Sequence, residues 1–134
     1  MLTWRDVRGH VVARHEVAEN LDDWVRLAPV DPEGVAVQLR HVAAGGRDRL
    51  VVAADIGPAS LVSAADAIAL NGRLLHGSLL FAHDILTLRR VLTIGWFQGE
   101  ELDATIAGIR AEGRQLREQL ARAGDSNVFN FLAE

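Results

Sequence analysis

The stretch LVSAADAIALNGRLLHGSLLFAHDILTLRRVL, from Leu61 to Leu92, decides the fold. In its first part, apolar residues recur at the three- and four-residue spacing of a helix, at positions 61, 64, 65, 68 and 69. Asn71-Gly72 then supplies residues that end helices by adopting left-handed dihedrals. From Leu75 onward apolar residues occur at every second position, with a turn at His83-Asp84. The stretch therefore predicts a helix followed by a hairpin of two strands.

A first helix is predicted at the start of the chain. Thr3 and Asp6 have the spacing of a loose capping box, in which the Thr3 hydroxyl accepts from a free amide at the helix start. Only short apolar runs mark the other end, which we expect between Arg14 and Asn20. The alternative is that residues 15–18 are already extended.

Three strands are predicted before the central stretch, with apolar alternation at residues 24–28, 35–40 and 50–56. Short connections rich in Pro or Gly separate them, so an antiparallel meander is the simplest pairing. After the hairpin, Glu100 and Glu101 favour the start of a long last helix, which Gly124 is expected to end. Trp96, just before this helix, is expected to pack beneath it.

The predicted order is helix, three strands, helix, two strands, helix. This order indicates an α+β domain with one five-stranded antiparallel sheet and three helices over residues 1–124. Residues 125–134 form a separate tail with four large apolar side chains. The tail either packs on its own domain or is an arm that reaches a partner or a second subunit; its apolar residues are Val128, Phe129, Phe131 and Leu132.

Composition narrows the class of partner. The formal net charge is −4 and the only basic doublet is Arg89-Arg90, which argues against binding the nucleic-acid backbone. We interpret this doublet as part of an exposed strand edge. No apolar run approaches the roughly 20 residues that span a bilayer, so we expect no membrane insertion and a cytoplasmic protein. The chain contains no cysteine, which excludes disulfides and thiolate chemistry.

The sequence offers no pattern of catalytic, cofactor-binding or metal-binding residues. His10 and His15 are five residues apart, which on a helix separates their directions by about 140°. His76 and His83 flank the hairpin turn, and no serine lies in a nucleophile elbow. Glycine pairs lack the following Lys-Ser/Thr of a phosphate loop. We therefore expect a protein that is not an enzyme and binds neither cofactor nor metal.

With these elements in place, residues 24–123 resemble the type III secretion chaperone-like fold, including YbjN-like domains. The resemblance rests on five segments: Val51–Gly57, Ala69–Asn71, Leu75–Leu79, Leu86–Leu92 and Glu101-Leu102. It is a pattern of elements and apolar positions, without an invariant catalytic signature.

The resemblance implies a homodimer that holds a segment of another protein on apolar surface. It implies dimer contacts around the central helix and the following strand, at Ile68, Leu75, Leu79 and Phe81. It implies partner contacts on the first helix and first strands, at Trp4, Val7, Val11, Trp24 and Leu27. Periodic aliphatic residues mainly fill cores, so the core alternative stays open for the aliphatic members of both sets. Two other functions remain open: a subunit that binds a folded partner, and a small enzyme or ligand-binding domain.

Overall fold

The computed structural model describes Met1 and residues 3–126. The described residues form one sheet of six strands in the order β1-β2-β3-β4-β6-β5, with every neighbouring pair antiparallel. The strands are β1 Val17–Leu21, β2 Trp24–Leu27, β3 Val37–Ala44, β4 Arg47–Pro58, β5 Ser78–Ala82 and β6 Ile85–Thr93. The helices are α1 Trp4–Arg14, α2 Ala64–Asn71 and α3 Gly99–Ser126, with a short 3₁₀ turn, η1, at Ala59–Leu61. The α+β class and the antiparallel meander are thus confirmed.

The predicted count of five strands is wrong, because β1 gave no pattern in the sequence. Its burial runs from half-buried at Val17 to exposed at the other four positions, so no alternation of apolar residues exists there. The alternative of an extended segment after α1 was therefore correct. α1 ends at Arg14, and His15 is already extended, with φ −129° and ψ 154°.

The predicted capping box of α1 is present. The Thr3 side chain accepts a hydrogen bond from the Asp6 amide at 3.2 Å, and the Asp6 carboxylate accepts one from the Thr3 amide at 3.2 Å. α2 begins at Ala64 and not at Leu61, because β4 continues to Pro58, where it pairs with Ile85, and is followed by η1 before Ser63 caps the helix.

Two predictions about helix ends differ from the structure. α2 ends at Asn71 as expected, but Gly72 has φ −66°, so the expected left-handed residue is absent from this helix end. Instead the Asn71 side chain pairs with the backbone of Leu79, accepting from its amide at 2.5 Å and donating to its carbonyl at 3.1 Å. The amide of Asn71 thereby acts like a neighbouring strand for β5. Gly124 does not end α3, which continues to Ser126.

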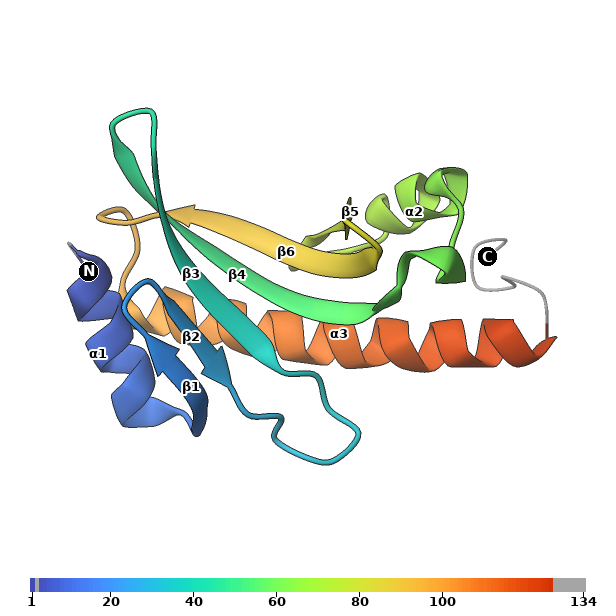
Figure 1. Ribbon diagram of the computed structural model, residues 1–134, viewed down its shortest axis with the longest axis horizontal. Coiled ribbons are helices and arrows are strands. Elements are labelled where there is room, and N and C mark those ends of the chain that lie inside the picture. The colour runs from blue at the N-terminus through green and yellow to red at the C-terminus, as the bar shows by residue number, and fades with distance from the viewer. Residues whose placement is uncertain (2, 127–134) are drawn as a thin grey trace.

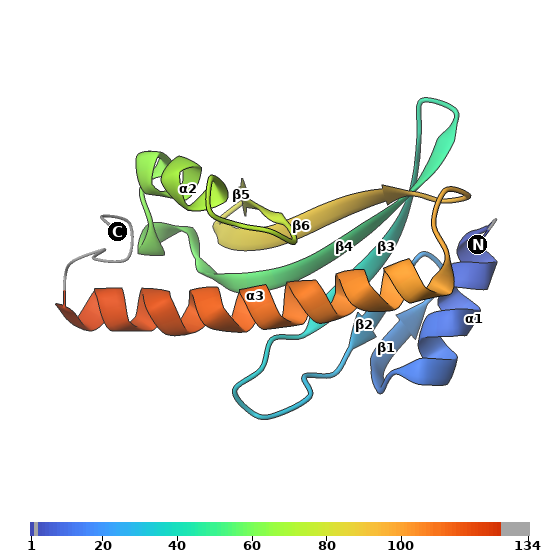
Figure 2. The ribbon, with the colours of Figure 1, turned by 180° about the vertical axis from the view of Figure 1, so that it is seen from behind.

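α3 lies along one face of the sheet (Figures 1 and 2). α1 lies at the β1–β2 end, and α2 lies beside β5 toward the other end. An apolar stripe of α3 is buried against the sheet and includes Leu102, Ile106, Ile109, Leu116 and Leu120. The sheet contributes Val25, Leu39, Val52 and Leu88, among others, to the same core.

Candidate interaction surfaces

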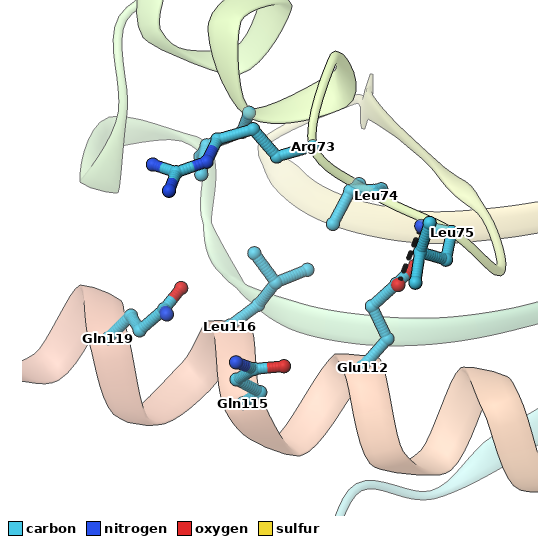
Figure 3. Close-up of a pocket in the computed structure, with 8 residues that line it drawn as sticks. Arg73, Leu74, Leu75, Glu112, Gln115, Leu116 and Gln119 are labelled. Atoms are coloured by element: carbon cyan, nitrogen blue, oxygen red, sulfur yellow. Dashed lines mark hydrogen bonds between the residues drawn. The ribbon is translucent and has the colours of Figure 1, made fainter. Parts of the chain in front are cut away.

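A buried carboxylate fixes the connection between α2 and β5. Glu112 lies on α3 with only 8% of its surface exposed. Its carboxylate accepts a hydrogen bond from the backbone amide of Leu75 at 2.9 Å (Figure 3). It also accepts from the backbone amides of His76 and Gly77 at 3.1 Å each. No arginine pairs with Glu112 within the described part of the chain, so three amide dipoles balance its charge. Residues 75–77 are thereby held against α3.

Two glycines allow this close approach. A Cβ on Gly77 would lie 2.9 Å from Ile109 Cδ1 and 3.1 Å from the Arg89 carbonyl oxygen. A Cβ on Gly108 would overlap the ring of His76, with Cγ at 2.6 Å. The connection therefore rests directly on α3, with no space for a side chain between them.

Apolar side chains on this connection and on the two elements that it joins are exposed to solvent. Leu75 is 85% exposed, Ile68 on α2 is 73% exposed and Phe81 on β5 is 40% exposed. We call these three residues the α2–β5 surface. Beside it, a cavity of about 300 Å³ opens between α2 and α3. Leucines form part of its wall, together with Arg73, Gln115 and Gln119 (Figure 3).

Leu79 does not belong to this surface. It is 6% exposed and lies in the core, where it pairs with Leu88 across the β5–β6 hairpin. Leu79 therefore offers no side-chain surface for the dimer contact implied by the resemblance.

Of the residues expected to contact a partner, the aliphatic ones are buried and the two tryptophans are partly exposed. Val7, Val11 and Leu27 have no exposed surface, because they fill the space between α1, the sheet and α3. Only the two tryptophans are half-buried. The ring of Trp4 is stacked on His41 with 5.7 Å between centroids and donates to the Asp22 carbonyl at 2.6 Å. The Nε1 of Trp24 is buried without a hydrogen-bond partner among the described residues.

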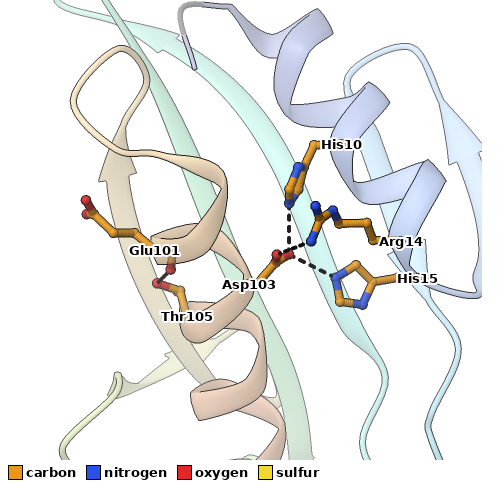
Figure 4. Close-up of polar contacts among 6 residues, drawn as sticks. All are labelled: His10, Arg14, His15, Glu101, Asp103 and Thr105. Carbon is orange, nitrogen blue, oxygen red and sulfur yellow. Dashed lines mark hydrogen bonds and ion pairs between the residues drawn. The ribbon is translucent and has the colours of Figure 1, made fainter.

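A polar cluster joins α1 to α3 around Asp103 (Figure 4). Its carboxylate lies 2.9 Å from His10 Nε2, 3.4 Å from His15 Nε2 and 3.3 Å from the Arg14 guanidinium. Partial burial acts to raise the pKa of Asp103, but the two histidine hydrogen bonds and the charges of His10 and Arg14 together hold the pKa below its usual value.

The prediction that His10 and His15 point apart is wrong, because it holds only for a continuous helix. His15 is the extended residue after α1, so its ring turns back to the same carboxylate as His10. Arg14 donates to this carboxylate as well. In the described part of the chain no three or more His, Cys, Asp or Glu side chains are placed to hold a metal ion.

His76 and His83 take part in backbone geometry. His76 donates its amide to Glu112, and His83 occupies the hairpin turn with φ 57°. Among the described residues, no hydrogen bond joins either ring to a carboxylate. Of the residues that the structure describes, Glu112 is the only carboxylate that lines the cavity beside α2, and it already accepts hydrogen bonds from backbone amides.

Three further expectations concern single segments. Arg89 does not lie on a strand edge, because it pairs with Ser78 of β5, whereas Arg90 lies past the end of the β5–β6 pairing, where β6 pairs with β4 alone. Trp96 does not pack beneath α3; it is 73% exposed, with the Arg47 guanidinium 5.4 Å from its ring. The apolar tail lies outside the described residues: Val128, Phe129, Phe131 and Leu132.

Comparison with solved structures shows the same arrangement of helices and strands in other proteins. A chain in the crystal structure of the ExsC–ExsE complex matches with a TM-score of 0.66 and 16% identity, covering 90% of this chain and 97% of that one. A chain in the HopA1–SchA chaperone–effector complex matches with a TM-score of 0.61 and 16% identity, covering 84% of this chain and 89% of that one. The fold is type III secretion chaperone-like.

The match to the ExsC–ExsE chain thus spans nearly the whole chain. No protein-family model and no curated protein matches the sequence. None of the helices in the described residues combines the length and the apolar character needed to cross a membrane.

Proposed function

We propose that the chain is a non-enzymatic, cytoplasmic protein-binding domain that forms a homodimer and holds a segment of another protein. The observation that carries this proposal is the fold, which it has in common with chains from two solved complexes, one of them described as a chaperone–effector complex. The relation to YbjN-like domains remains a prediction.

The α2–β5 surface is the proposed dimer contact. Ile68 and Leu75 expose most of their side chains, and apolar groups of this size are normally withdrawn from water in an assembly. The Glu112 hydrogen bonds hold Leu75 in this exposed position, so the surface is formed before a second copy binds. In a two-fold symmetric dimer, the α2–β5 surface of one copy would be buried against the same surface of the other.

Partner contact is proposed at the two tryptophans. Trp4 is fixed by its hydrogen bond and by His41, and it still presents part of its ring. Large aromatic side chains of this kind commonly anchor protein interfaces. Trp24 lies on the neighbouring end of the sheet, at the first residue of β2.

Affinity capture from the native host, followed by limited proteolysis of the retained protein with and without this chain, tests the proposal. The expected result is a retained protein with one segment that is cleaved rapidly alone and protected in the complex. A retained protein that resists cleavage equally well alone would favour the alternative of a folded partner. Failure to retain any protein would contradict the proposal.

A further inference from the structure

The sheet face turned away from α3 has its own chemistry. We call it the outer face. Strand alternation and register place Arg40 on β3, Val51 and Ala53 on β4, and Arg89 on β6 together on this face, since their neighbours Leu39, Val52 and Leu88 are buried on the other. Val51 pairs with Arg40, and Ala53 pairs with Arg89. The two arginines therefore flank an apolar floor on β4.

The floor is a shallow depression of about 310 Å³. Val42 and Leu80 extend the apolar lining from Val51 toward β3 and β5, and each is half-buried. No apolar residue of the outer face is fully buried within the described part of the chain, in contrast to the face under α3.

The charge of the outer face is opposite to that of the whole chain. Arg40 and Arg89 form no ion pair with any described residue, and alternation places Arg49 on the same face. Asp55, the carboxylate that lines the depression, accepts hydrogen bonds from Thr87 at 3.3 Å and Gln38 at 3.4 Å. The formal net charge of the whole chain is −4. The region around the depression is nevertheless positive, because its three arginines outnumber the single Asp55.

We propose that the outer face binds an amphipathic segment of the partner protein, in which carboxylates border a row of apolar side chains. This inference rests on the proposed function and specifies the chemistry of the partner. β3 and β6 are separated by two strand spacings, about 10 Å, which matches the width of a single peptide segment with its side chains. Carboxylates of that segment would pair with the unpaired guanidiniums of Arg40 and Arg89, which suit bidentate contact.

A phage-displayed library of random 16-residue peptides, selected on the purified full chain, tests this inference. Peptides enriched in Asp or Glu beside apolar residues are expected. Binding of the selected peptides should weaken about tenfold or more in Arg40→Glu/Arg89→Glu, and less in Arg40→Gln/Arg89→Gln, because charge reversal repels where neutralisation only removes attraction. Arg5→Glu/Arg122→Glu, with the same charge change at exposed positions on helices α1 and α3, should bind like the wild type.

Each other outcome is decisive in a different way. Selected peptides without acidic enrichment, or ones bound equally by Arg40→Glu/Arg89→Glu, would overturn the inference and leave the proposed function standing. No enriched peptide at all would contradict both. A fall in molecular mass of Arg40→Glu/Arg89→Glu by light scattering, with an unchanged circular dichroism spectrum, would assign the outer face to a second copy and overturn the inference.

Discussion

The side chain of Glu112 holds residues 75–77, in the connection between α2 and β5, against α3. Its two oxygens accept from three consecutive backbone amides while only 8% of the residue is exposed. A glutamine at this position would place an NH₂ group opposite amide donors and leave at least one of them unpaired. We expect Glu112→Gln to lower the free energy of unfolding by about 2–3 kcal/mol in urea titrations at a fixed protein concentration.

Glu118→Gln is the matched control. Glu118 lies on the same helix and pairs with Arg114 at 3.2 Å, but its side chain is 52% exposed. Its substitution is expected to cost less than about 0.5 kcal/mol. Equal effects of the two substitutions would refute the structural role assigned to Glu112.

Asp103 gives a pH dependence with a defined sign. Its pKa in the folded protein is lowered from 3.8, so its carboxylate stabilises the fold above that pH, and the stabilisation is lost as the pH falls through the lowered pKa. The difference in unfolding free energy between wild type and Asp103→Asn should therefore be largest above about pH 4 and shrink below it. Urea titrations at several pH values would measure this, and a difference independent of pH would refute it.

Residues with local partners could be predicted from the sequence, and residues with distant partners could not. Thr3 and Asp6 are three positions apart, and their capping box follows from spacing alone. Glu112 and Leu75 are 37 positions apart, and Asp103 and His10 are 93 apart. The only available signal for Glu112 was a carboxylate on the apolar stripe of α3, between Ile109 and Leu116.

At the scale of elements, the packing of the 75–77 connection on α3 leaves no space at Gly77. Gly77→Ala would force its methyl group against Ile109 and the backbone of β6, and we expect a loss of about 1–3 kcal/mol in stability. Gly9→Ala in α1, where no atom lies within 4 Å of the added carbon, should instead gain about 0.5–1 kcal/mol from helix propensity. Thermal unfolding of both variants and the wild type measures these changes in stability. Stabilisation by Gly77→Ala would contradict the close contact at this position.

The elements that the sequence predicted are those with a periodic apolar face. α3 and the β5–β6 hairpin have such faces, and both are present with the expected turn at His83-Asp84. β1 has none, since its backbone pairs with β2 while its side chains face solvent. The ends of α2 were also misjudged, because η1 and the Asn71 side chain replace the expected start and stop.

At the scale of the whole molecule, the proposed dimer predicts that two exposed residues control association. Ile68→Asp/Leu75→Asp should give monomers by light scattering with an unchanged circular dichroism spectrum, because both side chains are largely exposed in the single chain. Val30→Asp, at an 80% exposed position in the β2–β3 loop, should remain dimeric. Leu79→Asp should instead unfold the chain, since a buried carboxylate without a partner costs several kcal/mol. A wild type that is monomeric at all concentrations would contradict the dimer.

The overall architecture could be inferred from the order of elements, whereas the binding surfaces depended on which apolar residues the fold leaves exposed. The spacing of Val7, Val11 and Leu27 is the same for a core and for an interface, and only tertiary packing places all three in the core. Ile68, by contrast, had the periodicity of a core residue and is exposed.

Hydrogen–deuterium exchange of the complex captured from the native host tests the central claim, binding of a partner segment, most directly. The account predicts that one continuous segment of the partner exchanges rapidly when free and slowly when bound, and that protection on this chain appears at Trp4, Trp24 or the outer face. A partner that is already protected throughout when free, or a complex in which no continuous segment gains protection, would contradict the account.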